Sequence, residues 1–314
     1  MSGKAVGIIG AGNVGMAAAY ALFQRQIAGR LVLLDLDRRR AEGEAMDLMH
    51  GQALVGRVSV RAGDYADLAG CQVVVICAGV GQKPGESRLD LLNRNAAVFR
   101  EIAAGLDRHA PGAVLVVATN PVDILTAVMQ QLSNRPPERI VGTGTMLDTS
   151  RFRALLGEYY GVNPRSVHAY ILGEHGDSEV PLWSSAAIGG RTIVDQQVNG
   201  RPFDAAAMQA LFEQVRGAAY DIIERKGYTN TAIGLVIAYL VRVILEDQKS
   251  VLAVSIDPGG HYGLADVCLS IPCVIGSGGA ECAVPPVLSD QEHAGMYASA
   301  AVLRDSLSGM TIGS

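Results

Sequence analysis

The chain has 314 residues, of which 49% are hydrophobic and 18% are charged, and its formal net charge is −5. This composition is typical of globular α/β enzymes and excludes a largely disordered chain. The negative charge provides no broad basic surface, so we expect no nucleic acid partner. The longest apolar stretch, from Ala232 to Val241, is too short to cross a membrane, and the N-terminus has no signal-peptide pattern. We therefore expect a cytoplasmic protein with no membrane partner.

The cysteines form no pattern of a metal site. None belongs to a CxxC pair or has a histidine at zinc-ligand spacing. We expect free, buried thiols and no bound metal at all five positions, which are Cys71, Cys77, Cys268, Cys273 and Cys282.

Apolar runs of strand length alternate with helical stretches through the first half of the chain. Such runs, rich in β-branched residues and separated by helices, indicate a parallel sheet covered on both faces. Six of them are present, at 5–9, 31–35, 58–62, 73–77, 114–118 and 139–143. We predict an α/β fold in which residues 1–143 form a Rossmann-type, doubly wound parallel sheet.

The pattern changes after residue 143. We predict helices at 148–160, 204–224, 228–246 and 289–306, and strands at 168–172, 191–198, 251–256 and 267–275. Residues 144–314 should therefore form a mixed α+β domain that binds substrate and packs tightly against the first domain.

A glycine-rich turn follows the first predicted strand. Gly10 permits a tight turn, Gly12 lets the backbone approach a pyrophosphate, and Gly15 allows close helix packing. The helix that follows offers free N–H groups and a positive dipole to phosphate. A dinucleotide is the expected ligand.

The second strand ends at Asp35, where a carboxylate would bind the ribose hydroxyls and repel a 2′-phosphate. Three arginines, Arg38, Arg39 and Arg40, follow closely; one of them could hold a 2′-phosphate, although a solvated helix face is the favoured interpretation. Because of Asp35 we predict NAD rather than NADP.

Three ionisable residues form a candidate chemical site. His175 lies in a glycine-flanked loop, where it can exchange protons near neutral pH. Asp148 and Arg151 lie three residues apart at the start of a helix, hence on one face. Asp148 could orient His175 while Arg151 grips a carboxylate, or the two could form an ordinary surface ion pair.

Two further segments follow strand ends. The stretch from Gly79 to Asn95 contains Pro84 and two further glycines, and we predict a hinged loop that could close over substrate and deliver Arg88. Asn120 follows the fifth strand, at the edge of the sheet where ligands bind, and could donate a hydrogen bond to a carbonyl oxygen.

Together these segments resemble the lactate/malate dehydrogenase family over nearly the whole chain. The motifs GAGNVG, GQKPGESRLDLLNRN, ATNPVD, TMLDTSRFR, GEHGDSEVPLWS and KGYTNTAIG occur in the family's order and spacing. The resemblance implies that the chain is an NAD-dependent enzyme that reduces a 2-keto acid. It also implies that His175 donates the proton with Asp148 as its partner. Arg151 would bind the substrate carboxylate, and Arg88 would polarise the carbonyl. Asn120 and Asp123 would also face the substrate. The NAD-binding residues implied in this way, besides the glycines and Asp35, are Val14, Arg40, Tyr65, Gly79, Val80, Ala118, Asn120, Thr143 and Ile233.

Substrate choice within the family depends mainly on one loop position, which is Gln82 here. A neutral side chain provides no cation for the second carboxylate of oxaloacetate, so pyruvate is favoured and L-lactate is the expected product. Thr229 agrees with this pattern. Malate or a broader range of L-2-hydroxy acids remains the alternative.

The resemblance also bears on regulation and assembly. Arg153 and His168 match positions through which bacterial relatives bind fructose 1,6-bisphosphate, and the family implies a homotetramer. Two other classes fit less well: an NAD-using glycoside hydrolase would need a Cys/His metal site, and a non-enzymatic nicotinamide-binding protein would not need His175, Asp148 and Arg151 together.

Overall fold

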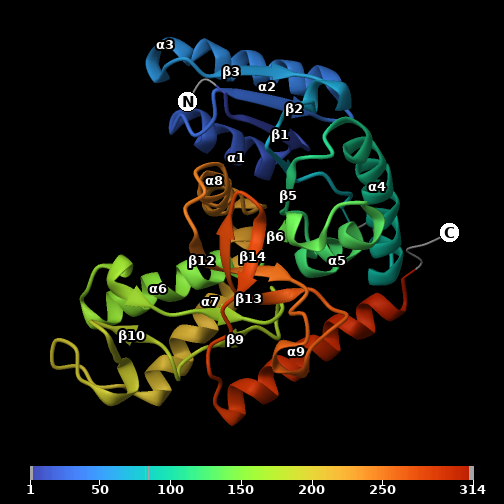
Figure 1. Ribbon diagram of the computed structural model, residues 1–314. Coiled ribbons are helices and arrows are strands. Elements are labelled where there is room, and N and C mark those ends of the chain that lie inside the picture. Colours follow the sequence, from blue (N-terminus) through green and yellow to red (C-terminus); the bar gives the residue numbers. More distant parts are fainter. Residues whose placement is uncertain (1–2, 82, 84, 311–314) are drawn as a thin grey trace.

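The computed structural model describes residues 3–81, 83 and 85–310. In Figure 1 the N-terminal strands and helices lie at the top, the segment from α6 to β11 lies at the lower left, and α9 runs along the lower edge. One large sheet connects the upper and lower parts of the molecule.

Six parallel strands confirm the Rossmann-type fold. They are ordered β3-β2-β1-β4-β5-β6 across the sheet, and each pairs in parallel with its neighbours. Strands β4 and β5 are fully buried, which explains their continuous runs of valine, leucine and isoleucine. The bounds are β1 (Ala5–Ile9), β2 (Arg30–Leu34), β3 (Ser59–Ala62), β4 (Val73–Ile76), β5 (Val114–Val117) and β6 (Ile140–Gly142).

Helices connect these strands and cover the sheet. Helix α1 contacts α2, and α4 contacts α5. The bounds are α1 (Asn13–Gln24), α2 (Arg38–His50), α3 (Gln52–Val55), α4 (Arg88–His109) and α5 (Val122–Leu132), with 3-10 turns η1 (Tyr65–Leu68) and η2 (Pro137–Arg139). The predicted loop from 79 to 95 is wrong in its second half, because Ser87 caps α4 by accepting a hydrogen bond from the Asp90 N–H.

The sheet continues beyond β6 with three antiparallel strands, which are β12 (Ser250–Ile256), β13 (Leu269–Gly276) and β14 (Gly279–Ala283). We expected the first two of these in a separate second domain, and β14 was not predicted. β12 pairs with β6 at Ser255 and Gly142. A Cβ on Gly142 would lie 2.8 Å from the Ser255 Cβ, so glycine permits this close approach. The sheet therefore extends across the boundary predicted at residue 143.

The rest of the second half is irregular around four helices. These are α6 (Met146–Tyr160), α7 (Ala205–Lys226), α8 (Thr231–Leu245) and α9 (Asp290–Ser308). The strands are short: β7 (Val167–His168), β8 (Ile171–Leu172), β9 (Val180–Pro181), β10 (Ala187–Ile188) and β11 (Arg191–Thr192). The remaining 3-10 turns are η3 (Pro164–Ser166), η4 (Ile193–Asp195) and η5 (His261–Gly263).

Two strand predictions are wrong in this region. The run predicted at 168–172 is divided between β7 and β8, which belong to different sheets. The run predicted at 191–198 ends after two residues and turns into η4, which buries Ile193 in the smaller core.

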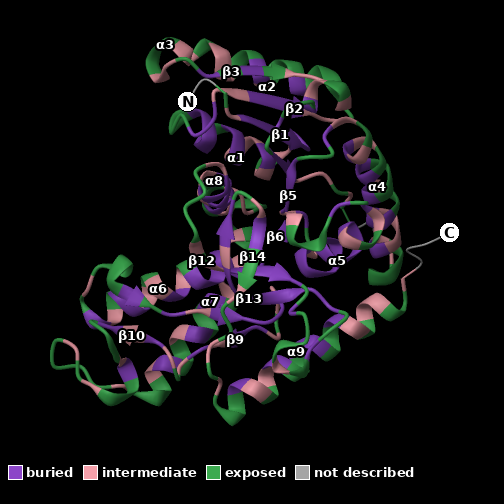
Figure 2. Cartoon of the chain, in the orientation of Figure 1, coloured by how far each residue is buried: buried purple, intermediate pink, exposed green. Residues whose placement is uncertain are grey.

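Two hydrophobic cores stabilise the chain. The larger one joins the sheet to its covering helices, and the smaller one joins Phe152, Tyr160 and Ile193 to Phe212 and Val215 of α7. In Figure 2 the buried residues follow the strands and the inner faces of the helices. None of the helices in the described ranges is long and apolar enough to span a bilayer.

The cysteines are free, but they are not all buried as expected. Cys71, Cys268 and Cys273 are buried, Cys77 is half-buried, and Cys282 is exposed. Cys282 lies on β14, where it and the preceding Glu281 are exposed to solvent. Among the residues that the structure describes, no group of three or more His, Cys, Asp or Glu side chains is arranged to hold a metal ion.

Candidate active site

The glycine-rich turn has the geometry that a dinucleotide requires. Gly10 has a φ of 100°, in the region that favours glycine. A Cβ on Gly15 would lie 1.9 Å from the carbonyl oxygen of Gly10, so only glycine lets α1 start this close to β1. A Cβ on Gly12 would meet open space. Gly12 therefore leaves room in front of the N–H groups that begin α1.

Asp35 shapes the same turn from the end of β2. Its carboxylate accepts hydrogen bonds from the backbone N–H of Ala11 at 2.6 Å and of Asp37 at 2.9 Å. Arg38 forms an ion pair with Glu42 at 3.0 Å on the exposed face of α2, which agrees with a solvated helix face.

A cavity of about 670 Å³ opens between this turn and the ends of β2 and β4. Seven of the predicted cofactor residues line it: Gly10, Gly12, Asp35, Arg40, Tyr65, Gly79 and Val80. The room beside Gly12, the free helix N-terminus and the Asp35 carboxylate together fit an NAD molecule.

The other predicted cofactor residues do not belong to the described lining of this cavity. Val14 and Ile233 are partly buried against the large core, on α1 and α8, which pack against each other. Ala118 and Thr143 follow β5 and β6, where Thr143 donates its backbone N–H to Val117. Asn120 lines the neighbouring cavity.

That neighbouring cavity, of about 350 Å³, contains the candidate catalytic group. His175 Nδ1 lies 2.6 Å from Asp148 Oδ2, and Arg151 Nη1 donates to Asp148 Oδ1 at 2.9 Å. Asp148 is buried, and its two oxygens are thus divided between the histidine and the arginine. Within the described residues, no hydrogen bond other than these two engages the His175 ring or the Arg151 guanidinium, so the Nε2 edge and the other guanidinium nitrogens can serve a ligand.

The electrostatics of this group favour a protonated histidine. Burial alone would lower the pKa of His175, but the adjacent Asp148 carboxylate overcomes that effect and raises it to about 9. Burial pushes the pKa of Asp148 upward, yet His175 and Arg151 hold it below its ordinary value. The site therefore holds an ionised carboxylate between two cations at neutral pH.

Asp123 holds the backbone of this group. Its Oδ2 accepts the His175 N–H at 2.7 Å from within the first turn of α5. Burial raises the pKa of Asp123 to about 6. Within the described part of the chain Asp123 does not line the cavity, so its contact is with the histidine loop rather than with the space a substrate would fill.

Helix α7 forms the opposite wall of the cavity. It contributes Arg216, Ala219, Tyr220 and Ile223, and the Tyr220 hydroxyl donates to Asp177 at 3.1 Å. The sequence analysis did not identify these residues, nor Glu179 on the near wall. In the sequence, Glu179 could have been noticed only as a member of the GEHGDSEVPLWS motif. The α7 residues could have been noticed only because their helix directly precedes KGYTNTAIG.

The site residues predicted on the hinged loop, and Thr229, are not among the described residues that line the cavity that contains His175. Arg88 is exposed at the first position of α4, and it is not among the described residues that line the cavity. Gln82 and Pro84 lie outside the described residues. Thr229 is half-buried in the link between α7 and α8.

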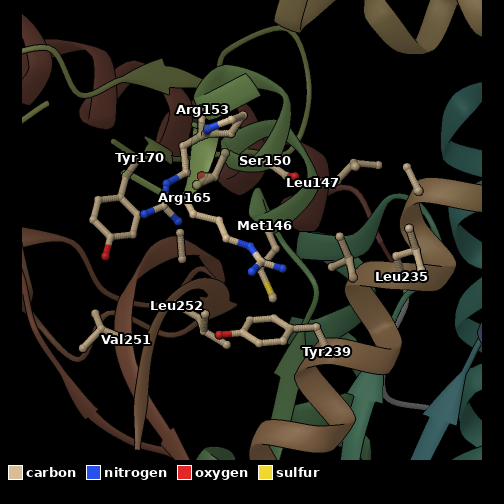
Figure 3. A pocket seen from close by; sticks show the side chains of 15 residues that line it. Met146, Leu147, Ser150, Arg153, Arg165, Tyr170, Leu235, Tyr239, Val251 and Leu252 are labelled. Atoms are coloured by element: carbon tan, nitrogen blue, oxygen red, sulfur yellow. The ribbon is translucent and has the colours of Figure 1, made fainter. Parts of the chain in front are cut away.

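The two residues predicted to bind a phosphorylated effector lie close together. Arg153 Nε donates to the carbonyl oxygen of Val167, which directly precedes the exposed His168 on β7. Arg153 also borders a pocket of about 360 Å³ whose lining includes Arg165 and Tyr170. Figure 3 shows both arginine side chains on the same side of this pocket, opposite Tyr239 and Leu235 of α8.

Comparison with known proteins covers both halves of the chain. Residues 4–142 match the model for the lactate/malate dehydrogenase NAD binding domain, and residues 145–311 match the model for the alpha/beta C-terminal domain of the same family.

Full-length relatives agree. The chain is 61% identical to an L-lactate dehydrogenase of Salinibacter ruber over 99% of this chain and 98% of the relative, and 47% identical to one of Thermus aquaticus over 97% and 99%. A solved minor L-lactate dehydrogenase of Enterococcus mundtii superposes with a TM-score of 0.95 at 39% identity over all of both chains. These matches show that the chain belongs to the lactate/malate dehydrogenase family.

Proposed function

We propose that this enzyme catalyses the reversible, NADH-dependent reduction of pyruvate to L-lactate in the cytoplasm. The observation that carries the proposal is the Asp148–His175–Arg151 group, which faces a cavity next to the dinucleotide cradle. It offers a proton and a fixed cation side by side, as a 2-keto carboxylate requires.

Arg151 binds the substrate carboxylate. Its side chain is only 16% exposed and one guanidinium nitrogen is fixed on Asp148, so the remaining donors are oriented before substrate arrives. Two parallel hydrogen bonds to a carboxylate would place the carbonyl carbon at a defined distance from His175.

His175 supplies the proton. When bound, NADH would supply the hydride for the new C–H bond at C2, and the electron pair of the carbonyl bond would move to oxygen. That oxygen takes the proton from Nε2 of His175, and Asp148 stabilises the imidazolium through Nδ1. In lactate oxidation the neutral histidine accepts the proton back. Reduction is therefore favoured at lower pH and oxidation at higher pH.

The remaining contacts are assigned by the family pattern. Arg88 polarises the carbonyl oxygen once the loop before α4 closes, and Asn120 donates to the same oxygen. Asp123 acts by fixing the His175 backbone. NAD is held by residues on both sides of the cradle: Gly10, Gly12, Val14, Gly15, Asp35, Arg40, Tyr65, Gly79, Val80, Ala118, Asn120, Thr143 and Ile233.

Gln82 and Thr229 select the side chain of the keto acid. A neutral Gln82 leaves the second carboxylate of oxaloacetate without a counter-charge, and Thr229 borders the space for the methyl group of pyruvate. Curated relatives of this chain at 46% to 61% identity are named L-lactate dehydrogenase, which supports pyruvate over oxaloacetate.

The test is NADH oxidation at 340 nm by the purified enzyme with pyruvate, oxaloacetate or 2-ketoisocaproate. We expect kcat/KM for pyruvate to exceed that for oxaloacetate by a factor of several hundred, and Gln82→Arg to reverse much of that preference. A wild-type preference for oxaloacetate would make the enzyme a malate dehydrogenase, and equal rates on the bulky acid would indicate a broader 2-hydroxy acid dehydrogenase.

The same assay tests regulation. The adjacency of Arg153 and His168 supports a phosphate site for fructose 1,6-bisphosphate, placed between subunits of a homotetramer. We expect activation by fructose 1,6-bisphosphate that disappears in Arg153→Gln, and a tetrameric mass by light scattering. Unchanged rates with the effector would remove the regulatory part of the proposal.

A further inference from the structure

Glu179 is a buried acid that the mechanism above does not use. It follows the His175 loop, where its backbone N–H donates to Gly176 at 3.2 Å, and it directly precedes β9. Its side chain lines the same cavity as Asp148, Arg151 and His175, and the residue is only 7% exposed.

Glu179 differs from the other buried acids near the site in its partners. Asp148 is paired with Arg151 and His175, Asp123 accepts the His175 N–H, and Glu292 accepts two hydrogen bonds from Ser184. Oε1 of Glu179 is buried and has no hydrogen-bond partner within the described residues. Oδ1 of Asp123 is in the same state, but the other oxygen of Asp123 accepts the His175 N–H, whereas the carboxyl group of Glu179 accepts no hydrogen bond from the described residues. A buried carboxylate without a donor is costly, and a protonated carboxyl in the same place costs much less because it carries no charge.

We propose that protonation of Glu179 is coupled to binding of the anionic substrate, so that the site takes up a proton at Glu179 in addition to the one at His175. The proposal rests on the proposed function, because the anion in question is the keto acid carboxylate on Arg151. An ionised Glu179 would compete with that carboxylate for the same cation and repel it across the cavity. By linkage, binding of the substrate then favours the protonated side chain.

The surrounding charges agree with this coupling. Burial and the Asp148 carboxylate raise the pKa of Glu179 to about 8, while His175, Arg151 and Arg216 act in the opposite direction. Binding a carboxylate to Arg151 neutralises one of these cations and so removes part of the stabilisation of the ionised form. Arg216 compensates little, because it is exposed and paired with Glu213.

Every packed element contributes charged or titratable groups that a measurement of pH dependence must include. They are Asp148 and Arg151 on α6, Asp123 on α5, Arg216 and Tyr220 on α7, Glu292 on α9, and Glu174, His175 and Asp177 on the loop itself. Of these, His175 is the group that shares the relevant range, since its pKa is about 9.

A proton count separates one coupled group from two. If His175 alone is linked to binding, uptake cannot exceed one proton per site at any pH. If Glu179 is linked as well, uptake can exceed one near pH 9, where both groups are partly deprotonated in the enzyme without substrate, and it must fall when Glu179 is replaced.

The experiment measures proton uptake when oxamate, the amide analogue of pyruvate, binds to the NADH complex. Calorimetry in buffers of different ionisation enthalpy gives the count from pH 7 to pH 9.5, and the slope of log Kd against pH gives it independently. The variants are Glu179→Gln, which keeps the size of the side chain without a charge, and Glu224→Gln, an exposed control on α7.

We expect the wild type and Glu224→Gln to take up more protons per site between pH 8 and pH 9 than Glu179→Gln, whose uptake cannot exceed one. An uptake by Glu179→Gln that equals that of the wild type from pH 7 to pH 9.5 would overturn the proposal even if pyruvate is reduced normally. A wild type that neither binds oxamate nor reduces pyruvate would overturn the proposed function, and this coupling with it.

Discussion

Replacing Asp148 by asparagine removes the charge that keeps His175 protonated. The pKa of His175 is about 9, against an ordinary value of about 6.5, so the surroundings stabilise the imidazolium by roughly 3 kcal/mol at about 1.4 kcal/mol per pKa unit. Burial opposes that stabilisation. Without the carboxylate charge, the pKa of His175 should fall below its ordinary value.

The direction of the pH dependence follows from which protonation state of His175 reacts. Pyruvate reduction needs the protonated histidine, and this form is dominant below the pKa of His175 and lost above it. In the wild type, nearly all His175 is protonated at pH 7.5. In Asp148→Asn the protonated fraction at pH 7.5 should be at most about a tenth of the wild-type fraction, and it should recover as the pH falls toward 5.5.

The assay is kcat/KM for pyruvate from pH 5.5 to pH 10, with NADH affinity measured by fluorescence to verify the fold. The position of the alkaline limb is the diagnostic quantity, because asparagine also perturbs the orientation of the ring and lowers the rate at every pH. Asp305→Asn, an exposed change on α9, is the control. An Asp148→Asn enzyme whose alkaline limb stays within half a pH unit of the wild type would refute this electrostatic reasoning.

Three further substitutions test the rest of the site. Gly12→Val should leave the melting temperature within about 2 °C but weaken NADH binding at least tenfold, since its Cβ meets open space that the pyrophosphate would fill, whereas Gly43→Ala on α2 should change neither quantity. Asp35→Asn should lower the kcat/KM preference for NADH over NADPH by about tenfold; an unchanged preference would assign the discrimination to other residues. Arg151→Gln should raise KM for pyruvate by a factor of 30 or more, about 2 kcal/mol for a buried charged partner, with NADH affinity preserved; a normal KM would remove Arg151 from the substrate site.

The pairing of Asp148 with Arg151 illustrates what spacing alone can provide. Two residues three positions apart on a helix had to share a face, and the structure adds that His175, 27 residues away, reaches the same carboxylate. The predicted Asp148–Arg151 ion pair is therefore present, but it is largely buried rather than on the surface, and His175 completes it. Periodicity cannot show this, because it contains no information about which loop packs against which helix.

Other differences have the same origin. The Ser87–Asp90 spacing is a helix-start signal that lies inside a segment rich in proline and glycine, so the start of α4 was obscured. The pairing of β12 with β6 joins residues more than a hundred positions apart through one glycine. Glu179 was not identified from the sequence. Its significance depends on the burial of Oε1 without a hydrogen-bond donor among the described residues, and only the three-dimensional packing shows this.

The most direct test of the central claim compares His175→Ala with the wild type in two measurements on the same preparations: NADH affinity by fluorescence titration and pyruvate turnover at 340 nm. His175 lines the substrate cavity and contacts Asp148, whereas the described lining of the dinucleotide cavity does not include it. For His175→Ala we expect NADH affinity within about threefold of the wild type and a fall in kcat for pyruvate of at least about a hundredfold. A variant that reduces pyruvate at a rate near that of the wild type would contradict the assignment of His175 as the proton donor.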